Sequence, residues 1–153
     1  MKKYTWLAVC ILILGCFAGC GTQTEQRKSQ NYENETLGFN FEIPLVWEDN
    51  YEVNEHVENG ITYTDFNYVY GWPQKKTTLL VSIIATDEET WTSQQLENEY
   101  YLMAINKEGI YFANKVPSVP EDVPFKEGSK KAKNFQTLLL SIQEVSKMFS
   151  LTR

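Results

Sequence analysis

The pair Asn59-Gly60 constrains the fold more than any other feature of this sequence, because it lies between two runs of alternating side chains. A two-residue Asn-Gly loop favours a tight type I′ turn, which fixes the residues that face each other across the two strands. One face is predicted to be apolar, with Tyr51 opposite Tyr68, Val53 opposite Phe66 and Val57 opposite Thr62. The other face is predicted to be polar, with Glu52 opposite Asn67, Asn54 opposite Asp65, His56 opposite Tyr63 and Glu58 opposite Ile61.

Further strands and a helix are indicated along the rest of the chain. Alternation predicts a strand over 39–43 that Pro44 ends, and a mainly apolar run over 79–85 predicts a buried central strand. Residues 100–105 and 110–116 predict a strand pair around a turn. An apolar stripe predicts a long C-terminal helix; its members are Phe135, Leu138, Leu139, Ile142, Val145 and Phe149. We therefore expect an α+β fold, with a mostly antiparallel sheet of about five to six strands covered by helices.

A short acidic run follows the central strand at Asp87-Glu88-Glu89. Asp87 is suited to the N-cap of a helix, and the two glutamates suit its first turn, where the helix dipole favours negative charge. Trp91 and Leu96 would then pack inward. The alternative interpretation is an acidic cluster that binds a metal ion.

The N-terminus has the pattern of a secretory signal peptide. Lys2 and Lys3 precede an uncharged run over 7–18, which as a helix would span roughly 18 Å, too little for a bilayer core of about 30 Å. Phe17-Ala18-Gly19-Cys20 resembles the lipobox of bacterial lipoproteins, although that family usually has Leu where Phe17 stands. The resemblance implies a signal peptide over 1–19, diacylation of Cys20 and a lipid anchor on the extracytoplasmic face of the bacterial cell membrane. A second candidate cysteine, Cys16, and an uncleaved N-terminal anchor are the alternatives.

Removal of residues 1–19 changes the composition that matters for function. The remaining chain has 12 basic and 20 acidic residues, a net charge of −8, and its sole cysteine is Cys20. Bulk charge therefore argues against binding to nucleic acid or to an anionic lipid surface. With no free thiol and one histidine, the sequence contains no motif for a metal or a cofactor.

A polar segment follows the candidate lipidation site. Residues 20–36 contain Tyr32 as their one large apolar side chain apart from the cysteine, so we expect a lipidated Cys20 and a flexible tether there. The sequon Asn34-Glu35-Thr36 falls in this segment and is expected to be unmodified in a bacterial lipoprotein. A single globular α+β domain is expected over 37–153.

The opening of that domain, Gly38-Phe39-Asn40-Phe41-Glu42-Ile43-Pro44 with Trp47 three residues later, resembles small lipoprotein domains of Gram-positive bacteria. Those domains are often assigned to the PsbP-like α/β/α sandwich. The order of the later strands and of the proline-containing loop before the last helix is compatible with that family. The resemblance implies a fold and an anchor but no catalytic residue, because PsbP itself is a non-enzymatic accessory subunit.

The candidate binding residues are Tyr68, Tyr70 and Trp72, an aromatic group in which Gly71 and Pro73 place Trp72 in a loop. Exposed aromatic rings can stack on sugars, peptides or aromatic side chains of a partner. The alternative is that both tyrosines belong to the buried face of the sheet.

The sequence therefore predicts a surface-anchored, non-catalytic module that binds a protein or a cell-wall component through the rim of its sheet. Two alternatives stay open: a hydrolase with a pair of carboxylates, and an inhibitor-type domain that acts through the Tyr70–Trp72 loop. His56 is interpreted as a solvated side chain on the polar face of the hairpin. Lysines at 130, 131 and 133 lie where the last helix begins, and their charge opposes the helix dipole there. We interpret them as solvated side chains that slightly destabilise the helix; contact with anionic wall polymers or headgroups is the alternative.

Overall fold

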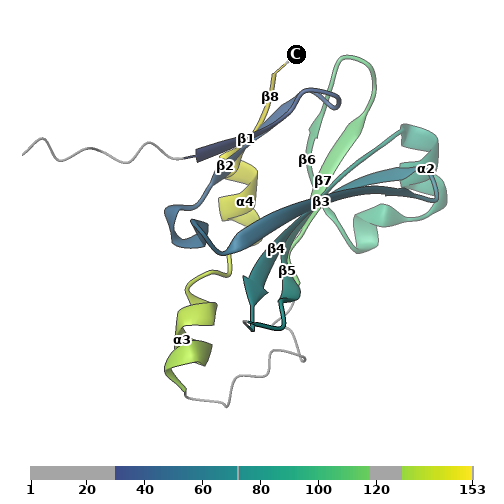
Figure 1. Cartoon of the computed structure of the whole chain (residues 1–153). Coiled ribbons are helices and arrows are strands. Elements are labelled where there is room, and N and C mark those ends of the chain that lie inside the picture. Colours follow the sequence, from purple (N-terminus) through teal and green to yellow (C-terminus); the bar gives the residue numbers. More distant parts are fainter. Residues whose placement is uncertain (1–29, 72, 118–128, 153) are drawn as a thin grey trace, which may run out of the picture.

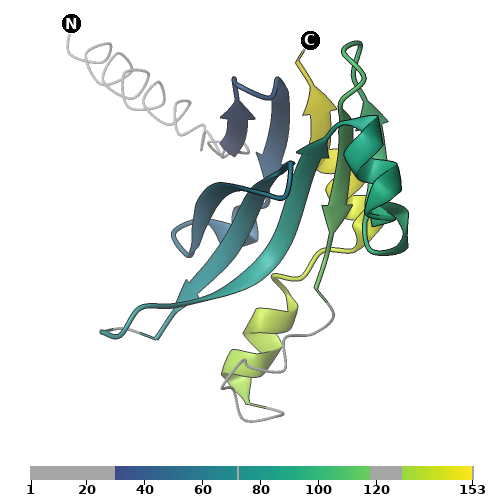
Figure 2. The ribbon, with the colours of Figure 1, turned by 90° about the vertical axis from the view of Figure 1, so that its right-hand side faces the viewer.

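The computed structural model describes residues 30–71, 73–117 and 129–152, which form two antiparallel sheets and short helices (Figures 1 and 2). The smaller sheet has the order β1-β2-β8 and the larger has the order β3-β4-β5-β7-β6. The elements are β1 (Gln30–Asn34), β2 (Phe39–Ile43), η1 (Leu45–Trp47), β3 (Tyr51–Glu58), β4 (Ile61–Tyr70), β5 (Lys76–Thr86), α2 (Glu88–Ser93), η2 (Leu96–Asn98), β6 (Tyr101–Ile105), β7 (Tyr111–Lys115), α3 (Lys130–Gln136), α4 (Ile142–Met148) and β8 (Phe149–Leu151). The α+β class is confirmed, and the three-stranded sheet is an addition to the single sheet that the sequence predicts.

The β3–β4 hairpin has the predicted register along its whole length. Asn59 and Gly60 have φ angles of 51° and 80°, as a type I′ turn requires. Two side chains near the tip depart from the predicted faces: Val57 is 71% exposed, whereas Ile61 is 2% exposed. The core on the predicted apolar face ends before Val57, and Trp91 packs against Ile61 from the other side.

The larger hydrophobic cluster joins both sheets to the last helix. Phe39 and Phe41 of β2, Phe66 of β4, Phe112 of β7 and Val145 of α4 are all fully buried in it. Burial of each large apolar side chain contributes roughly 1.5–3 kcal/mol relative to exposure. This cluster therefore holds the three-stranded sheet against one face of the five-stranded sheet.

The predicted tether is wrong from Gln30 onward, because residues 30–34 form β1 and pair with β2. Tyr32 orders this segment: its ring lies edge-on to Phe66 at 5.3 Å, and its hydroxyl donates a hydrogen bond to Glu55. Asn34 is 6% exposed; its Oδ1 accepts from the amide of Leu37 at 2.8 Å, and its Nδ2 donates to Glu55 at 2.8 Å. The amide nitrogen of the sequon is therefore hidden in the folded domain.

The prediction of a long C-terminal helix is also wrong. Phe135 lies in α3, Leu138 and Leu139 lie in the connection that follows it, Ile142 and Val145 lie in α4, and Phe149 lies in β8. Trp47 donates its Nε1 hydrogen to the carbonyl of Leu138 at 2.8 Å, and a continuous helix would need that carbonyl for the amide four residues later. A new helix then begins at a capping box between Ser141 and Glu144. Phe149 ends the stripe in β8, paired with Phe41 of β2.

The remaining local predictions are confirmed where the structure describes them. β5 contains the predicted central strand, β6 and β7 lie within the two ranges predicted for the strand pair, and α3 begins at Lys130. Asp87 caps α2 by accepting a hydrogen bond from the amide of Thr90 at 2.7 Å, which lowers the pKa of this carboxyl. Trp91, on the inner side of α2, is buried as predicted. The proline-containing loop over 118–128 lies outside the described residues.

Candidate functional site

The predicted aromatic group lies at the end of β4. Tyr68 and Tyr70 are half-buried and their rings stack, with centroids 6.0 Å apart and planes 11° apart. Tyr68 also packs against Phe135 of α3, with ring centroids 5.6 Å apart. Packing of α3 therefore accounts for the position of Tyr68, as the alternative interpretation expects. Trp72 lies outside the described residues.

His56 lies on the outer face of the five-stranded sheet, where its ring stacks on Tyr63 at 4.6 Å. Its Nδ1 is 3.8 Å from Oδ2 of Asp65, whose other carboxylate oxygen accepts a hydrogen bond from Ser82 Oγ at 2.6 Å. The residue types of a nucleophilic triad thus lie together, but the carboxylate is between the hydroxyl and the imidazole. Because the imidazole of a triad must accept the hydroxyl proton, this order leaves Ser82 without an activating base.

Tyr63 and Tyr100 extend this group toward β6. We call His56, Asp65, Ser82, Tyr63 and Tyr100 together the histidine row. Burial raises the pKa of Tyr63 to about 12, with a further contribution from Tyr100, and burial also raises the pKa of Tyr100. Lys115 Nζ lies 5.2 Å from the ring centroid of Tyr100 and 2.9 Å from Oε2 of Glu99. Its hydrogen bond lowers the pKa of Glu99. Near neutral pH the row therefore presents uncharged phenols next to an ion pair.

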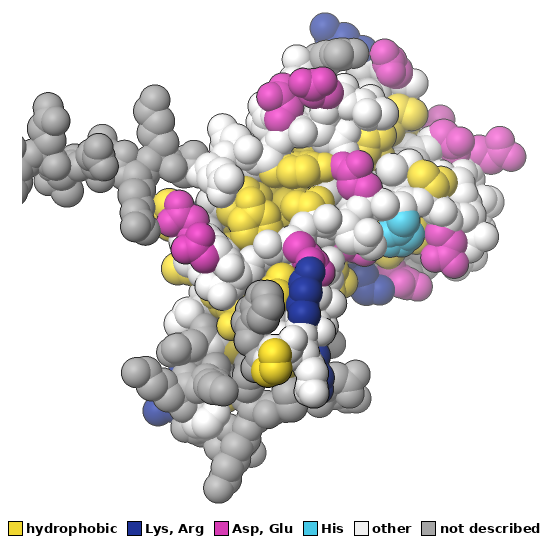
Figure 3. Space-filling view, in the orientation of Figure 1, with side chains coloured by type: hydrophobic (Ala, Val, Ile, Leu, Met, Phe, Trp, Pro, Cys, Tyr) yellow, Lys and Arg dark blue, Asp and Glu magenta, His cyan; other side chains and the backbone are white. Residues whose placement is uncertain are grey.

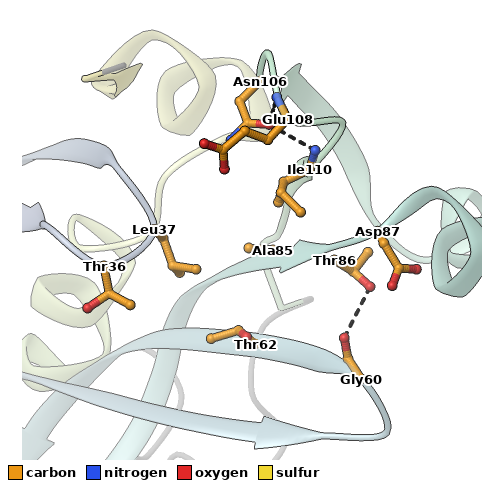
Figure 4. A pocket seen from close by; sticks show the side chains of 10 residues that line it. All are labelled: Thr36, Leu37, Gly60, Thr62, Ala85, Thr86, Asp87, Asn106, Glu108 and Ile110. Carbon is orange, nitrogen blue, oxygen red and sulfur yellow. Dashed lines mark hydrogen bonds between the residues drawn. The ribbon is translucent and has the colours of Figure 1, made fainter.

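A hollow of about 320 Å³ opens where hairpin tips meet (Figure 4). Residues from the β1–β2 turn, the β3–β4 hairpin, the end of β5 and the β6–β7 turn surround it. The lining residues are Thr36, Leu37, Gly60, Thr62, Ala85, Thr86, Asp87, Asn106, Glu108 and Ile110. Four segments that are far apart in the sequence therefore form one concave surface.

The lining combines polar groups with an apolar wall. Threonine hydroxyls come from three different segments, and Leu37, Ala85 and Ile110 supply apolar contact. Thr86 Oγ1 donates to the carbonyl of Gly60 at 3.3 Å, so part of this polar surface is fixed by the fold. The described lining residues include no lysine or arginine.

The two carboxylates of the hollow do not form the facing pair that the hydrolase alternative requires. In the view of Figure 4, Asp87 and Glu108 lie on opposite sides of Ile110. Asp87 is also committed to the α2 cap, and a depressed pKa keeps it ionised, whereas a general acid needs a raised pKa.

The sequence predictions did not include the hollow, and of the histidine row they included only the pair on β3 and β4. The row follows from the predicted hairpin register, which sets His56 opposite Tyr63; the contribution of β5 needed the pairing of Asp65 with Ser82. The local signals at the hollow are turn residues: Asn106 Oδ1, for example, accepts from the amides of Glu108 and Ile110 at 3.0 and 2.9 Å. Such signals locate turns but do not say which turns will meet.

The predicted lipidation site Cys20, the signal peptide over 1–19 and the first part of the tether lie outside the described residues. Within 30–71, 73–117 and 129–152, no helix is long and apolar enough to cross a bilayer. The same described ranges hold no group of three or more His, Cys, Asp or Glu side chains placed to bind a metal ion.

Comparison of the chain with known protein families, with curated proteins and with solved structures gave no match. A functional assignment must therefore come from the residues of this chain.

Proposed function

We propose that this chain is a non-catalytic binding domain, held on the extracytoplasmic face of a bacterial cell membrane by a lipid on Cys20. Its ligand is a neutral or amine-bearing saccharide of the cell wall, bound in the hollow at the hairpin tips. The observation that carries the proposal is the lining of that hollow, which combines hydroxyls and carboxylates with apolar side chains and has no basic residue among its described members.

The chemistry of the lining favours this ligand class. Sugar hydroxyls can exchange hydrogen bonds with Thr36 and Thr62, while the C–H face of a ring can contact Leu37 and Ile110. An anionic ligand would meet the carboxylate of Glu108 without a compensating cation. The volume is near the lower end of the usual range for ligand pockets, roughly 300–1,000 Å³, so a short wall fragment fits better than a polymer.

The position of the hollow suits a tethered receptor. β1 starts at Gln30, ten positions after Cys20, and leads to the turn at Thr36 and Leu37 that lines the hollow. Five residues of strand span about 17 Å. The ligand would therefore bind at the end of the hairpin remote from the anchor.

The resemblance to PsbP-like domains supports the non-catalytic part of this proposal, because that family includes an accessory subunit that is not an enzyme. We propose a PsbP-like sandwich as the family of the fold on that resemblance alone.

Calorimetric titration of the full lipidated chain in vesicles with N-acetylglucosamine oligosaccharides, which are neutral, and with their de-N-acetylated, amine-bearing forms tests the binding site. A Thr36→Trp substitution at this exposed turn should fill the hollow and weaken binding by about tenfold. The matched control is Thr77→Trp, an exposed threonine near the start of β5 that does not line the hollow, and it should bind like the parent. Equal affinity of the parent and Thr36→Trp would contradict the site.

The charge of the ligand is tested with Glu108→Gln and its control Glu97→Gln, an exposed glutamate that does not line the hollow. Weaker binding of an amine-bearing fragment to Glu108→Gln alone would support recognition of a cation. Unchanged binding of that fragment would support a neutral ligand.

The anchor is tested separately by growing cells with a labelled fatty acid. The label should appear on the mature chain and be lost, together with stable membrane association, in Cys20→Ser, because a stable anchor requires covalent lipid chains. An unlabelled parent chain, or a Cys20→Ser chain that stays on the membrane, would contradict the anchor.

A further inference from the structure

The η1 turn presents two exposed apolar side chains. Leu45 is 49% exposed and Val46 is 54% exposed, although they lie between the buried residues Ile43 and Trp47. Trp47 is fully buried and its Nε1 donates to the carbonyl of Leu138 at 2.8 Å, while its own amide donates to the carbonyl of Pro44 at 2.9 Å. The turn is thus fixed from below, and its apolar side chains stay on the surface.

This turn lies beside the entry of the chain into the domain. Gln30, the first residue of β1, pairs with Ile43, the last residue of β2, and η1 begins two residues later. Both views place the turn next to the start of β1 (Figures 1 and 2). Figure 3 shows hydrophobic surface on the same side of the molecule, interspersed with acidic side chains.

We propose that Leu45 and Val46 insert into the interfacial region of the lipid bilayer and set the orientation of the domain on the membrane. The inference rests on the proposed lipid anchor at Cys20. It adds a second, non-covalent contact between the folded domain and the same membrane.

The length of chain between the anchor and the domain supports the bilayer as the occupant. Cys20 and Gln30 are ten positions apart, so even a fully extended segment spans at most about 33–36 Å. A surface confined so close to its target experiences an effective concentration of order millimolar. A contact too weak to bind a free domain to lipid would therefore be populated in the anchored chain.

The charges that flank the turn define the preferred lipid. Glu48 and Asp49 follow Trp47, and Asp49 is exposed, so anionic headgroups would repel this surface. Insertion should be deepest in zwitterionic phosphatidylcholine vesicles and shallower when anionic lipid is added.

A fluorescent label distinguishes the inserted turn from the rest of the surface. Because the lipid blocks Cys20, a Val46→Cys substitution provides one reactive thiol in the full lipidated chain, and Val57→Cys provides a matched control. Val57 is another exposed valine, six residues along β3 from Tyr51 and hence about 20 Å further from the turn.

In phosphatidylcholine vesicles, the label at Val46→Cys should shift to shorter wavelength and lose roughly half of its emission to nitroxide-bearing lipids. The label at Val57→Cys should show neither effect. Equal quenching at the two positions, or none at either, would overturn the proposal. Quenching at Val46→Cys that increases with anionic lipid would overturn the role assigned to the charges.

Failure of the anchor gives a different result from failure of the insertion. A chain without lipid at Cys20 does not sediment with vesicles, whereas a lipidated chain with a solvent-exposed turn sediments and shows no quenching at position 46. A Leu45→Ser variant of the Val46→Cys chain supplies a second measurement: it should reduce quenching about twofold while sedimentation stays complete.

Discussion

The two ends of the β1–β2 hairpin present opposite surfaces. Where β1 begins, Leu45 and Val46 form an exposed apolar turn; where β1 ends, Thr36 borders a polar hollow. Each end nevertheless has the same construction, because a buried side chain lies one or two positions from the exposed ones. Trp47 is fully buried beside Val46, and Asn34 is 6% exposed beside Thr36. The comparison teaches that a short strand pair can hold two different surfaces in fixed positions when a buried side chain lies next to each surface.

The largest expected effect on stability comes from removing Trp47, the buried side chain that fixes the apolar end of the hairpin. Trp47→Ala removes a fully buried indole and its hydrogen bond to Leu138, and should lower the free energy of unfolding by about 3–5 kcal/mol in urea titrations. Trp47→Phe keeps most of the apolar contact and should lose only about 1–3 kcal/mol. A loss below about 1 kcal/mol for Trp47→Ala would show that the turn is not held in this way.

At the polar end, Asn34→Ala removes the acceptor for the amide of Leu37 and a donor to Glu55. We expect a loss of about 1–3 kcal/mol, with faster hydrogen exchange at the amide of Leu37. Asn31→Ala, at an exposed position of the same strand, is the control and should change stability by less than about 0.5 kcal/mol. Equal losses of stability in the two variants would contradict the role of Asn34 in fixing the polar end of the hairpin.

Alkaline pH should loosen β1 between the two ends. Burial, followed by the hydrogen bond to Glu55 and its charge, raises the pKa of Tyr32 from 10.0 to about 12. The neutral phenol is the form that the fold favours, so its contribution is complete below pH 10 and is lost as the pH rises through about 12. Unfolding titrations from pH 9 to pH 12 should show a steeper loss for the parent than for Tyr32→Phe. Parallel curves would exclude this contribution, since Tyr63 is common to both proteins.

The smallest effect on stability is expected at the exposed side chains. Leu45→Ser and Val46→Ser should each change the free energy of unfolding by less than about 0.5 kcal/mol, as should Val57→Ser. A larger loss at position 45 or 46 alone, measured by urea titration without lipid, would mean that these side chains serve the fold rather than the membrane.

The predictions that succeeded depend on residues that lie close together in the sequence. Asn59-Gly60 sets the hairpin register because the turn itself dictates it, and Asp87 starts α2 through a hydrogen bond three residues away. The predictions that failed depend on distant contacts. Nothing near Tyr32 in the sequence shows that its ring will pack against Phe66. Nothing near Leu138 shows that Trp47 will donate a hydrogen bond to its carbonyl.

The candidate site follows the same rule. Tyr68 and Tyr70 share a strand face as their spacing predicts, and they stack. The hollow, in contrast, needs Thr36, Thr62 and Glu108 from three separate hairpins. Each residue occurs in an ordinary local setting, so the site exists only through the way in which the two sheets pack.

The pairing of β8 with β2 has a consequence for the order in which the chain can fold. Phe149 and Leu151, close to the C-terminus, complete the sheet that Phe39 and Phe41 begin. This contact spans nearly the whole domain, and such long-range strand pairing forms late because much chain must be ordered first. The strands of the five-stranded sheet all lie between Tyr51 and Lys115, so this sheet can form before residues 149–151 are ordered. The smaller sheet is completed only when β8 pairs with β2.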